Sequence, residues 1–424
     1  MAAASPASPA RVARSLSVRR MESRYGVGLT ESQPSVPTTA RPRNLVQGMI
    51  VVSSSLVLAA LPLFMVGGLA VQVKADLGLS EAALGAAVTI GFVVGALSAP
   101  IGGRLADRIG PKTSIYIGSS LSVLALAGLG LFVDGWAPLV AFLCLAGLAV
   151  AITDPGLAIL VNRAIPESKQ GLAFGVKEAS IPAATLAAGI AVPAIALTVG
   201  WRWGFAIGLL PWLIVITMLP SLRTDAPPRV VTSDDGRAPR TPPRRRALLL
   251  ASIAAAFGTA AASGVGIFLT DSAVAMGSTP AAAGILLAVG SVTGIVARVG
   301  TGVMADRKGG PQFRLISLML AIGAVTMALG GTGNPWLLVV GTVGAFTGGW
   351  AWTGIFFLSL VRVFPDRPGA VAGIGTAGLG VGNAAGPLLF GVVAQTSSYG
   401  MAWLAAGIVA AVASVLMSLA RRQF

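Results

Sequence analysis

Long apolar runs, separated by short polar segments, dominate the 424-residue chain. Twelve of these runs reach or approach the roughly 20 apolar residues that a helix needs to cross a bilayer. The pattern therefore predicts an all-α polytopic membrane protein with twelve transmembrane helices. Their predicted bounds are 45–73, 82–105, 113–133, 138–163, 168–199, 201–219, 247–273, 280–304, 312–331, 335–363, 368–395 and 398–420.

The polar segments predict how the chain is divided. Residues 1–43 are rich in Ala, Ser, Pro and Arg and have no apolar core, which excludes a secretory signal and predicts a disordered cytoplasmic tail. A transit peptide has a similar composition, and Met21 is an alternative start. Residues 220–246 contain prolines and three consecutive arginines and predict a cytoplasmic linker. The predicted six-helix halves are then 44–219 and 247–420, with a cytoplasmic tail at 421–424.

Composition supports a membrane protein and narrows its chemistry. The chain is 55% hydrophobic and 11% charged, with a mean hydropathy of +0.83, which is too apolar for a soluble protein of this length. It has no His, and its single cysteine, Cys144, falls in an apolar run, so we expect no metal site, disulfide or cofactor. Without a catalytic constellation or a Walker-type phosphate loop, we expect neither an enzyme nor ATP hydrolysis.

The net charge of +15 is a topology signal. With the N-terminus placed inside, all Lys and Arg residues count on the inner side except Lys74, Arg202 and Lys177. This asymmetry follows the positive-inside rule. It predicts a multi-pass protein of the cell membrane with both termini in the cytoplasm, and it argues against a nucleic-acid partner.

One eight-residue segment occurs twice. Gly-Arg-Leu-Ala-Asp-Arg-Ile-Gly at 103–110 returns as Gly-Val-Met-Ala-Asp-Arg-Lys-Gly at 302–309, and a shift of 199 positions superposes the two without a gap. The match continues upstream, because Gly78, Gly85 and Gly95 fall on Gly277, Gly284 and Gly294. The agreement predicts an internal duplication.

The repeated pattern of Gly, Asp-Arg and Gly resembles the loop motif of the major facilitator superfamily, and the resemblance covers residues 44–420. It implies two pseudo-symmetric six-helix halves, with substrate bound between them near mid-membrane and alternating access by their rocking. The resemblance also implies that the repeated motif has a gating role, in which it stabilises the outward-facing state. The alternative is that the charges of the motif only determine the membrane topology. The motif residues are Gly103, Asp107, Arg108, Gly110, Gly302, Asp306 and Arg307.

The second copy departs from the family pattern. The family has a basic pair after the last glycine, whereas this chain has Pro111-Lys112 after the first copy and Gly310-Pro311 after the second. We therefore expect the second loop to hold its Asp less firmly.

Between positions 373 and 386, span eleven contains six glycines, and Pro387 follows them, a composition that allows close packing and bending inside a membrane. It resembles the helices with which the family rocks one half against the other. Its partner in the first half, span five, carries Lys177 and Glu178, which have no ionisable counterpart in the second half.

Ionisable residues within spans are costly and usually face a cavity or each other. Asp154 and Lys177 each lie about 13 Å from the inner end of their span, so we expect them to pair. Glu178 lies about 100° further round the helix and should not share the direction of Lys177. The group is either a fixed ion pair between spans four and five or a proton-coupling site.

Arg298 lies in span eight, eight residues before Asp306. It resembles the carboxylate-binding Arg of the monocarboxylate and organic-anion branches of the superfamily, a task that suits its planar guanidinium. Alternatively it extends to the inner membrane surface. Asp271, late in span seven, is expected at the external mouth more than in the binding site.

Span ten contains Trp350 and Trp352, which are two positions apart and so face different directions. We expect one to line the substrate site and the other to pack or to face lipid. Asn383, a polar residue among the glycines of span eleven, is expected to face the cavity.

These observations predict a secondary transporter that moves a small organic anion by alternating access, coupled to protons. The alternative within transport is a proton-driven exporter of hydrophobic or cationic compounds, and outside transport a non-transporting receptor with the same fold. The expected partners are a small-molecule substrate, protons and the lipid bilayer, and we expect a monomer.

Overall fold

A computed structural model describes residues 42–164, 169–222, 245–364 and 368–424. Within these ranges the chain is helical and contains no strand. Twelve helical segments are long and apolar enough to cross a membrane. The predicted fold class, an all-α polytopic membrane protein, is thereby confirmed. The predicted N-terminal tail and linker fall almost wholly outside the described residues, and the division into halves stays a prediction.

The spans follow the predicted bounds within a few residues, except that the first helix ends early and a short helix follows it. In chain order the elements are α2 (Pro42–Gly68), α3 (Ala70–Leu77), α4 (Glu81–Ile109), α5 (Pro111–Leu131), α6 (Trp136–Ala164), α7 (Gln170–Ala191), η2 (Val192–Ala196), η3 (Trp201–Gly208), α8 (Leu209–Met218), α9 (Arg245–Ala275), α10 (Pro280–Lys308), α11 (Phe313–Gly330), α12 (Pro335–Gly344), η4 (Ala345–Gly349), α13 (Thr353–Val363), α14 (Pro368–Thr396) and α15 (Tyr399–Arg421).

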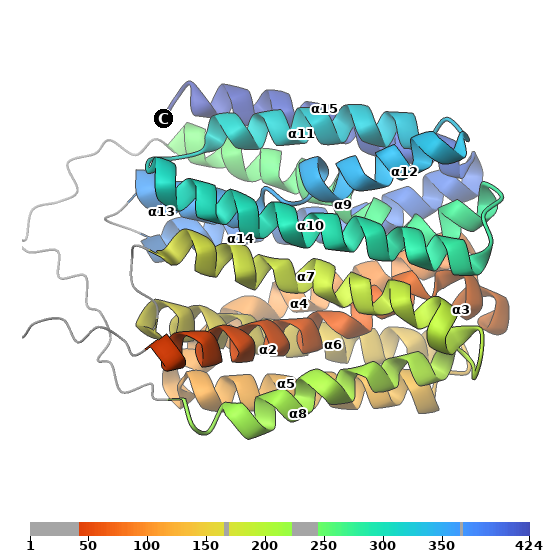
Figure 1. Cartoon of the computed structure of the whole chain (residues 1–424), viewed down its shortest axis with the longest axis horizontal. Coiled ribbons are helices and arrows are strands. Elements are labelled where there is room, and N and C mark those ends of the chain that lie inside the picture. Colours follow the sequence, from red (N-terminus) through yellow and green to blue (C-terminus); the bar gives the residue numbers. More distant parts are fainter. Residues whose placement is uncertain (1–41, 165–168, 223–244, 365–367) are drawn as a thin grey trace, which may run out of the picture. The chain divides into compact units, whose positions relative to one another are not determined.

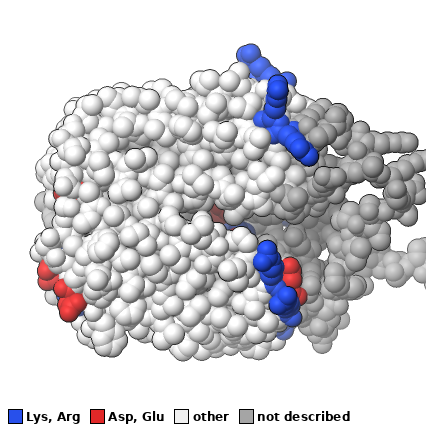
Figure 2. Space-filling view, turned by 180° about the vertical axis from the view of Figure 1, so that it is seen from behind, with Lys and Arg blue, Asp and Glu red and all other residues white. Residues whose placement is uncertain are grey.

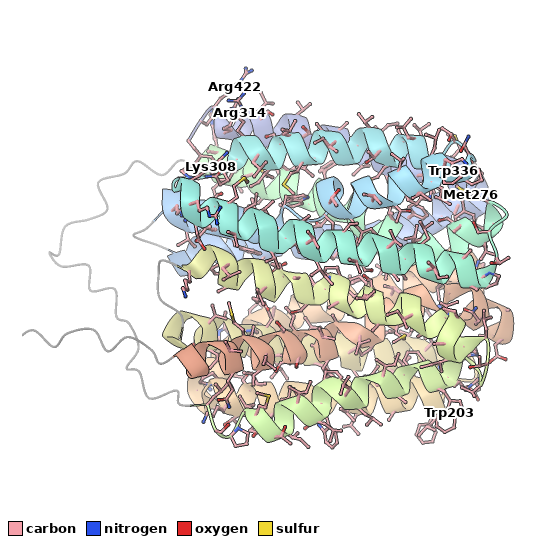
Figure 3. The ribbon with its side chains drawn as sticks, in the orientation of Figure 1. Trp203, Met276, Lys308, Arg314, Trp336 and Arg422 are labelled. Atoms are coloured by element: carbon pink, nitrogen blue, oxygen red, sulfur yellow. The ribbon has the colours of Figure 1, made fainter. Side chains whose placement is uncertain are left out.

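The helices run side by side between two ends (Figure 1). Figure 3 places Lys308, Arg314 and Arg422 at one end and Trp203, Met276 and Trp336 at the other. We call the first the motif end, because α4 and α10 both end there with their copies of the repeated motif, and the second the distal end. Lys and Arg side chains gather at the motif end (Figure 2).

Capping residues set the distal starts of α4 and α10. The side chain of Ser80 accepts a hydrogen bond from the Ala83 amide, and that of Thr279 accepts one from Ala282. Each satisfies an amide that the first turn of a helix leaves without a partner. The two equivalent helices therefore begin with equivalent caps.

The helix interruption lies in span ten and not in span eleven, for which the sequence predicted close packing and bending. α14 is one continuous helix, whereas span ten consists of α12, the π-helical η4, a turn and α13. The glycines of α14 serve close packing instead. A Cβ on three of them would collide with backbone carbonyls of α9; the pairs are Gly378 with Ser252, Gly382 with Ala256 and Gly386 with Ala260.

Two helix pairs join the first six spans to the last six: α7 with α10, and α4 with α14. Near the distal end the α4–α14 pair is tied by Thr89, whose hydroxyl donates to the Ala384 carbonyl at 2.6 Å. The distal parts of α2 and α9 also meet, and the Thr270 hydroxyl donates to the Gly67 carbonyl at 3.1 Å. These contacts enclose the middle of the bundle, where the candidate site lies.

Candidate functional site

An ion pair joins spans four and five inside the bundle. The Lys177 ammonium on α7 lies 2.7 Å from Oδ1 of Asp154 on α6, as the equal depths of the two residues predicted. The Asp154 side chain is 37% exposed, whereas that of Lys177 is 11% exposed. Asp154 is therefore the member of the pair that solvent or a solute can reach.

Glu178 belongs to the same group. Its Oε1 lies 3.4 Å from the Lys177 ammonium, although the two side chains make their other contacts with different helices, as their different directions on α7 predicted. The other oxygen, Oε2, accepts a hydrogen bond of 3.1 Å from the Thr353 hydroxyl on α13. Glu178 thus links the first six spans to the last six, and Thr353 is a site residue that the sequence analysis missed.

Arg298 is almost fully buried, with 1% of its surface exposed, which overturns the alternative that it extends to the membrane surface. α10 packs closely against α7 at this level. A Cβ on Gly175 would lie 2.8 Å from the Arg298 carbonyl, so only glycine fits there. The guanidinium Nη2 donates to the Trp350 carbonyl at 3.1 Å. Nε and Nη1 have no hydrogen-bond partner in the part of the chain that the structure describes.

The break in span ten explains how a backbone carbonyl reaches Arg298. Non-helical backbone at membrane depth requires other partners for its polar groups. Arg298 supplies one for the Trp350 carbonyl, and the Trp352 indole supplies another by donating to the Gly349 carbonyl at 2.7 Å. The Gly348-Gly349 pair was the sequence signal for this break, because glycines weaken a helix and permit close approach.

The two tryptophans have different surroundings, and both are buried. The Trp350 ring centroid lies 5.4 Å from Cζ of Arg298 and 5.6 Å from the ring of Phe64 on α2. Trp352 packs edge-on against Phe356 within the last six spans. Trp350 therefore borders the candidate site, while Trp352 packs in the core.

Two further predicted residues lie outside this group. Asp271 is at the distal end of α9, where Lys74 pairs with it at 2.7 Å. Asn383 lies on α14, and its buried Oδ1 has no partner among the described residues. Within the described ranges neither residue forms a hydrogen bond or ion pair with Lys177 or Arg298, so their assignment to the substrate site stays a prediction.

The second copy of the motif is engaged with a helix end. Asp306 accepts hydrogen bonds from the amides of Gly171 at 2.8 Å and Leu172 at 2.9 Å, both in the first turn of α7. Arg362 of α13 lies 3.9 Å from the same carboxylate. These groups replace the missing basic pair, because the start of a helix offers free amides and a partial positive charge.

The first copy is less engaged. Asp107 and Arg108 are exposed, and neither has a hydrogen-bond or ion-pair partner within the described ranges. Nothing lies within 4 Å of a Cβ placed on Gly103. The expectation that the second loop holds its Asp less firmly is therefore wrong.

The last glycine of each copy serves the turn that follows. Gly110 and Gly309 have positive φ values of 81° and 63°, which side chains other than glycine rarely adopt. Arg307, next to the engaged Asp306, is exposed like its counterpart Arg108.

The charges of the candidate site balance. Asp154, Glu178, Lys177 and Arg298 sum to zero when all four are ionised, and the group extends over α6, α7 and α10. Among the described residues no cluster of His, Cys, Asp and Glu has the composition to hold a metal ion. Figure 2 shows a hollow in the bundle in which charged atoms lie among uncharged ones.

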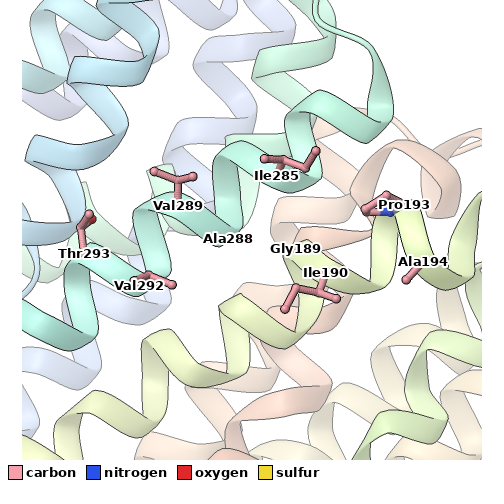
Figure 4. A pocket seen from close by; sticks show the side chains of 9 residues that line it. All are labelled: Gly189, Ile190, Pro193, Ala194, Ile285, Ala288, Val289, Val292 and Thr293. Carbon is pink, nitrogen blue, oxygen red and sulfur yellow. The ribbon is translucent and has the colours of Figure 1, made fainter.

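A separate groove of about 520 Å³ lies between α7 and α10 on the outer surface (Figure 4). Its lining is apolar, including Ile190, Ile285 and Val292, and the hydroxyl of its polar member, Thr293, donates to the Gly290 carbonyl of its own helix. The groove therefore offers no group to bind a charged solute, and it is not the candidate site.

Sequence comparison identifies the family of this chain. Residues 45–358 match the Major Facilitator Superfamily. The chain belongs to this superfamily. The relatives that it matches are transporters, so the chain is a transporter of the superfamily with twelve membrane-spanning helices.

Three comparisons describe this likeness. The chain is 29% identical to the oxalate:formate antiporter of Oxalobacter formigenes, over 65% of this chain and 68% of that protein. It is 28% identical to an uncharacterised MFS-type transporter of Mycobacterium tuberculosis, over 29% of this chain and only 22% of that protein. A crystal structure of a D-xylose-proton symporter superposes with a TM-score of 0.70 at 16% identity, covering 88% of this chain and 97% of that one. The last likeness concerns the fold alone.

Proposed function

We propose that this chain moves a small organic anion across the cell membrane, coupled to protons, by alternating access between its two halves. The observation that carries the proposal is Arg298. A buried guanidinium with two unpartnered nitrogens leaves N–H donors unsatisfied, which is unfavourable unless a ligand accepts from them. A carboxylate is the ligand that fits, because it accepts two parallel hydrogen bonds from a guanidinium.

The other cation does not compete for this role. Lys177 is already in contact with Asp154 and Glu178, so its charge is matched within the protein. The likeness to an oxalate:formate antiporter supports an anionic substrate, since both molecules in that name are carboxylates. The proposal of an anionic substrate therefore rests on Arg298.

Charge balance supports proton coupling. The candidate site is neutral before substrate binds, so a carboxylate bound to Arg298 adds one negative charge to a buried group. A proton taken up by Glu178 or Asp154 restores neutrality and avoids the cost of an unmatched buried charge. Protonation of Glu178 also weakens its contacts with Lys177 and Thr353, and the second of these joins the two sets of spans.

One observation favours the alternative, an exporter of cationic or hydrophobic compounds. The Asp154 carboxylate is the most exposed charge of the site and offers an acceptor to a cation. Transport of an anion requires Arg298, whereas export of a cation does not. A variant of Arg298 therefore distinguishes the two functions.

The proposed orientation places the motif end in the cytoplasm. Basic side chains gather at that end, as the positive-inside rule requires of a cytoplasmic face (Figure 2). A monomer is sufficient, because the candidate site is built within one chain.

Uptake into proteoliposomes with an imposed pH gradient tests the proposal. Formate, oxalate and larger carboxylates are compared with lipophilic cations, for wild type and for Arg298→Gln, with Arg202→Gln as the matched control because Arg202 lies at the distal surface. We expect the gradient to drive uptake of a carboxylate, Arg298→Gln to lose it and Arg202→Gln to retain it. Uptake of carboxylate by Arg298→Gln at the wild-type rate contradicts the role of Arg298, and movement of cations alone contradicts the anion proposal. Binding without movement of any solute indicates the receptor.

A further inference from the structure

A second buried polar group lies at the distal end, away from the candidate site. Lys74 on α3 contacts Glu81 on α4 at 2.8 Å and Asp271 on α9 at 2.7 Å. The Tyr399 hydroxyl on α15 donates to Asp271 and lies 3.3 Å from the Lys74 ammonium. We call these four residues the distal ion network.

The distal ion network joins the two sets of spans through Lys74, which contacts both Asp271 and Tyr399. Lys74 and Glu81 belong to the first six spans, whereas Asp271 and Tyr399 belong to the last six. Lys74 with Asp271 is therefore the ion pair that bridges them. The pair lies beside the Thr270–Gly67 contact, where α2 and α9 close the distal end.

Lys74 and Asp271 each have a second partner within their own set of six spans. If the pair separates, Lys74 keeps Glu81 and Asp271 keeps the hydroxyl of Tyr399. Separation of a buried pair is normally costly because it leaves charges uncompensated. Here the two additional partners reduce that cost, which makes the contact suited to repeated opening and closing. Burial lowers the pKa of Lys74, but hydrogen bonds and charges from Asp271 and Glu81 outweigh it and raise the pKa above its usual value, so the cation persists.

The opposite end of the same molecule is arranged differently. Near the motif end, a Cβ on Gly103 of α4 or on Gly373 of α14 would meet nothing within 4 Å. At the distal end Gly391 of α14 is so close to α4 that its Cβ would lie 2.6 Å from the Glu81 carbonyl. The structure is thus closed at the distal end, where the ion network lies.

We propose that Lys74 and Asp271 form the distal gate of the transporter, an ion pair that holds the distal end closed in this state and separates when that end opens. Glu81 and Tyr399 are the partners that hold each charge while the gate is open. The inference rests on the alternating access of the proposed function and not on the identity of the substrate.

The test measures opening directly, without substrate. Cys144 is replaced by Ser, and Thr270→Cys, a near-isosteric change at a site 2% exposed between α2 and α9, becomes the single thiol. In nanodiscs, the rate of labelling by a polar maleimide reports how often the distal end opens. All variants share this background, so the lost Thr270 hydroxyl affects them equally.

Lys74→Met and Asp271→Asn each remove the bridging pair, and we expect each to raise the labelling rate about tenfold. Two controls keep the bridge. Arg202→Met breaks the 2.6 Å pair with Asp76, which lies at the same end but within the first six spans. Glu81→Gln removes a partner of Lys74 but leaves the Lys74–Asp271 contact. Arg202→Met should label at the background rate. Glu81→Gln should label at that rate or more slowly, because loss of the partner that holds Lys74 makes separation of the bridging pair more costly.

Each labelling result either supports or refutes the gate. If Lys74→Met and Asp271→Asn label no faster than Arg202→Met, the gate is refuted. If Glu81→Gln accelerates labelling as much as Asp271→Asn, the network has only a general structural role and the gate is again refuted. Asp271→Asn is nearly isosteric, which provides a folded variant where Lys74→Met does not fold. Faster labelling together with movement of cations alone supports the gate while it refutes the anion proposal.

Discussion

The two copies of the repeated motif, residues 103–110 and 302–309, align without a gap and yet lie in different surroundings. In the second copy, a Cβ on Gly302 would lie 2.5 Å from the Gly171 carbonyl, and Asp306 binds the first turn of α7. In the first copy, Gly103 faces open space and Asp107 is exposed. Similar sequences therefore produce one engaged and one disengaged loop in the same molecule.

The partner helices repeat this difference. Gly175 of α7 and Gly373 of α14 are equivalent at an offset of 198, but a Cβ on Gly175 would lie 2.8 Å from the Arg298 carbonyl, whereas one on Gly373 would meet nothing. At the distal end both helix pairs are in contact, because Gly284 approaches Gly189 and Gly85 approaches Pro387. The α4 and α14 helices thus separate towards the motif end, while α10 and α7 stay together. An internal duplication fixes which residues can meet, and the conformational state decides which of them do.

The largest expected difference between the two copies is steric. Gly302→Ala places a methyl group against backbone that cannot move aside easily, and overpacking of this kind costs about 1–3 kcal/mol. Gly103→Ala enters open space and should change stability by less than about 0.5 kcal/mol. Thermal unfolding of the purified variants in detergent measures both. Equal losses of stability would show that the two helix pairs are packed alike.

The aspartates should differ by a smaller amount. Asp306→Ala leaves the first turn of α7 without its acceptor, and loss of such a cap costs about 0.5–2 kcal/mol. Asp107→Ala removes no contact of the described structure and should leave the unfolding temperature nearly unchanged. The prediction fails if Asp107→Ala is the more destabilised variant in the same assay.

The smallest expected effect concerns the neighbouring arginines. Arg362 donates to the carbonyls of Ala305 and Gly310 and stands near Asp306, so Arg362→Gln should cost up to about 1 kcal/mol. Arg108→Gln is the matched change in the disengaged copy and should cost nothing measurable. High salt should reduce the difference between the two variants, because screening weakens the ion pair. A loss that is independent of salt would assign the effect to the two hydrogen bonds alone.

The contacts of Lys177 show how much of the candidate site the sequence predicted. The depth of each residue along its helix predicted that Asp154 meets Lys177, and the pair is present. The helical rotation between neighbouring residues placed Glu178 in another direction, and its contact with Thr353 agrees, but this rotation did not predict the additional 3.4 Å contact with Lys177. The Thr353 contact joins positions 175 residues apart, a separation at which no local pattern applies.

Span ten is a second feature that the sequence predicted only in part. The sequence indicated a continuous span with two tryptophans on different faces, and the structure keeps that difference but interrupts the helix at η4. The interruption depends on Arg298 of another helix, which accommodates the released Trp350 carbonyl. A local sequence rule could not predict it, because the partner that makes the break tolerable lies 52 positions away.

By itself, the sequence determined the twelve spans, the duplication and the family, because hydrophobic length, glycine spacing and a short motif are properties of local sequence. Only the tertiary structure decided that Arg298 is buried with unpartnered nitrogens, that Glu178 connects the two sets of spans, and that Lys74 meets Asp271. It also decided which copy of the motif is engaged. Each of these facts depends on the positions of helices relative to one another, which follow from tertiary packing and not from any local pattern in the sequence.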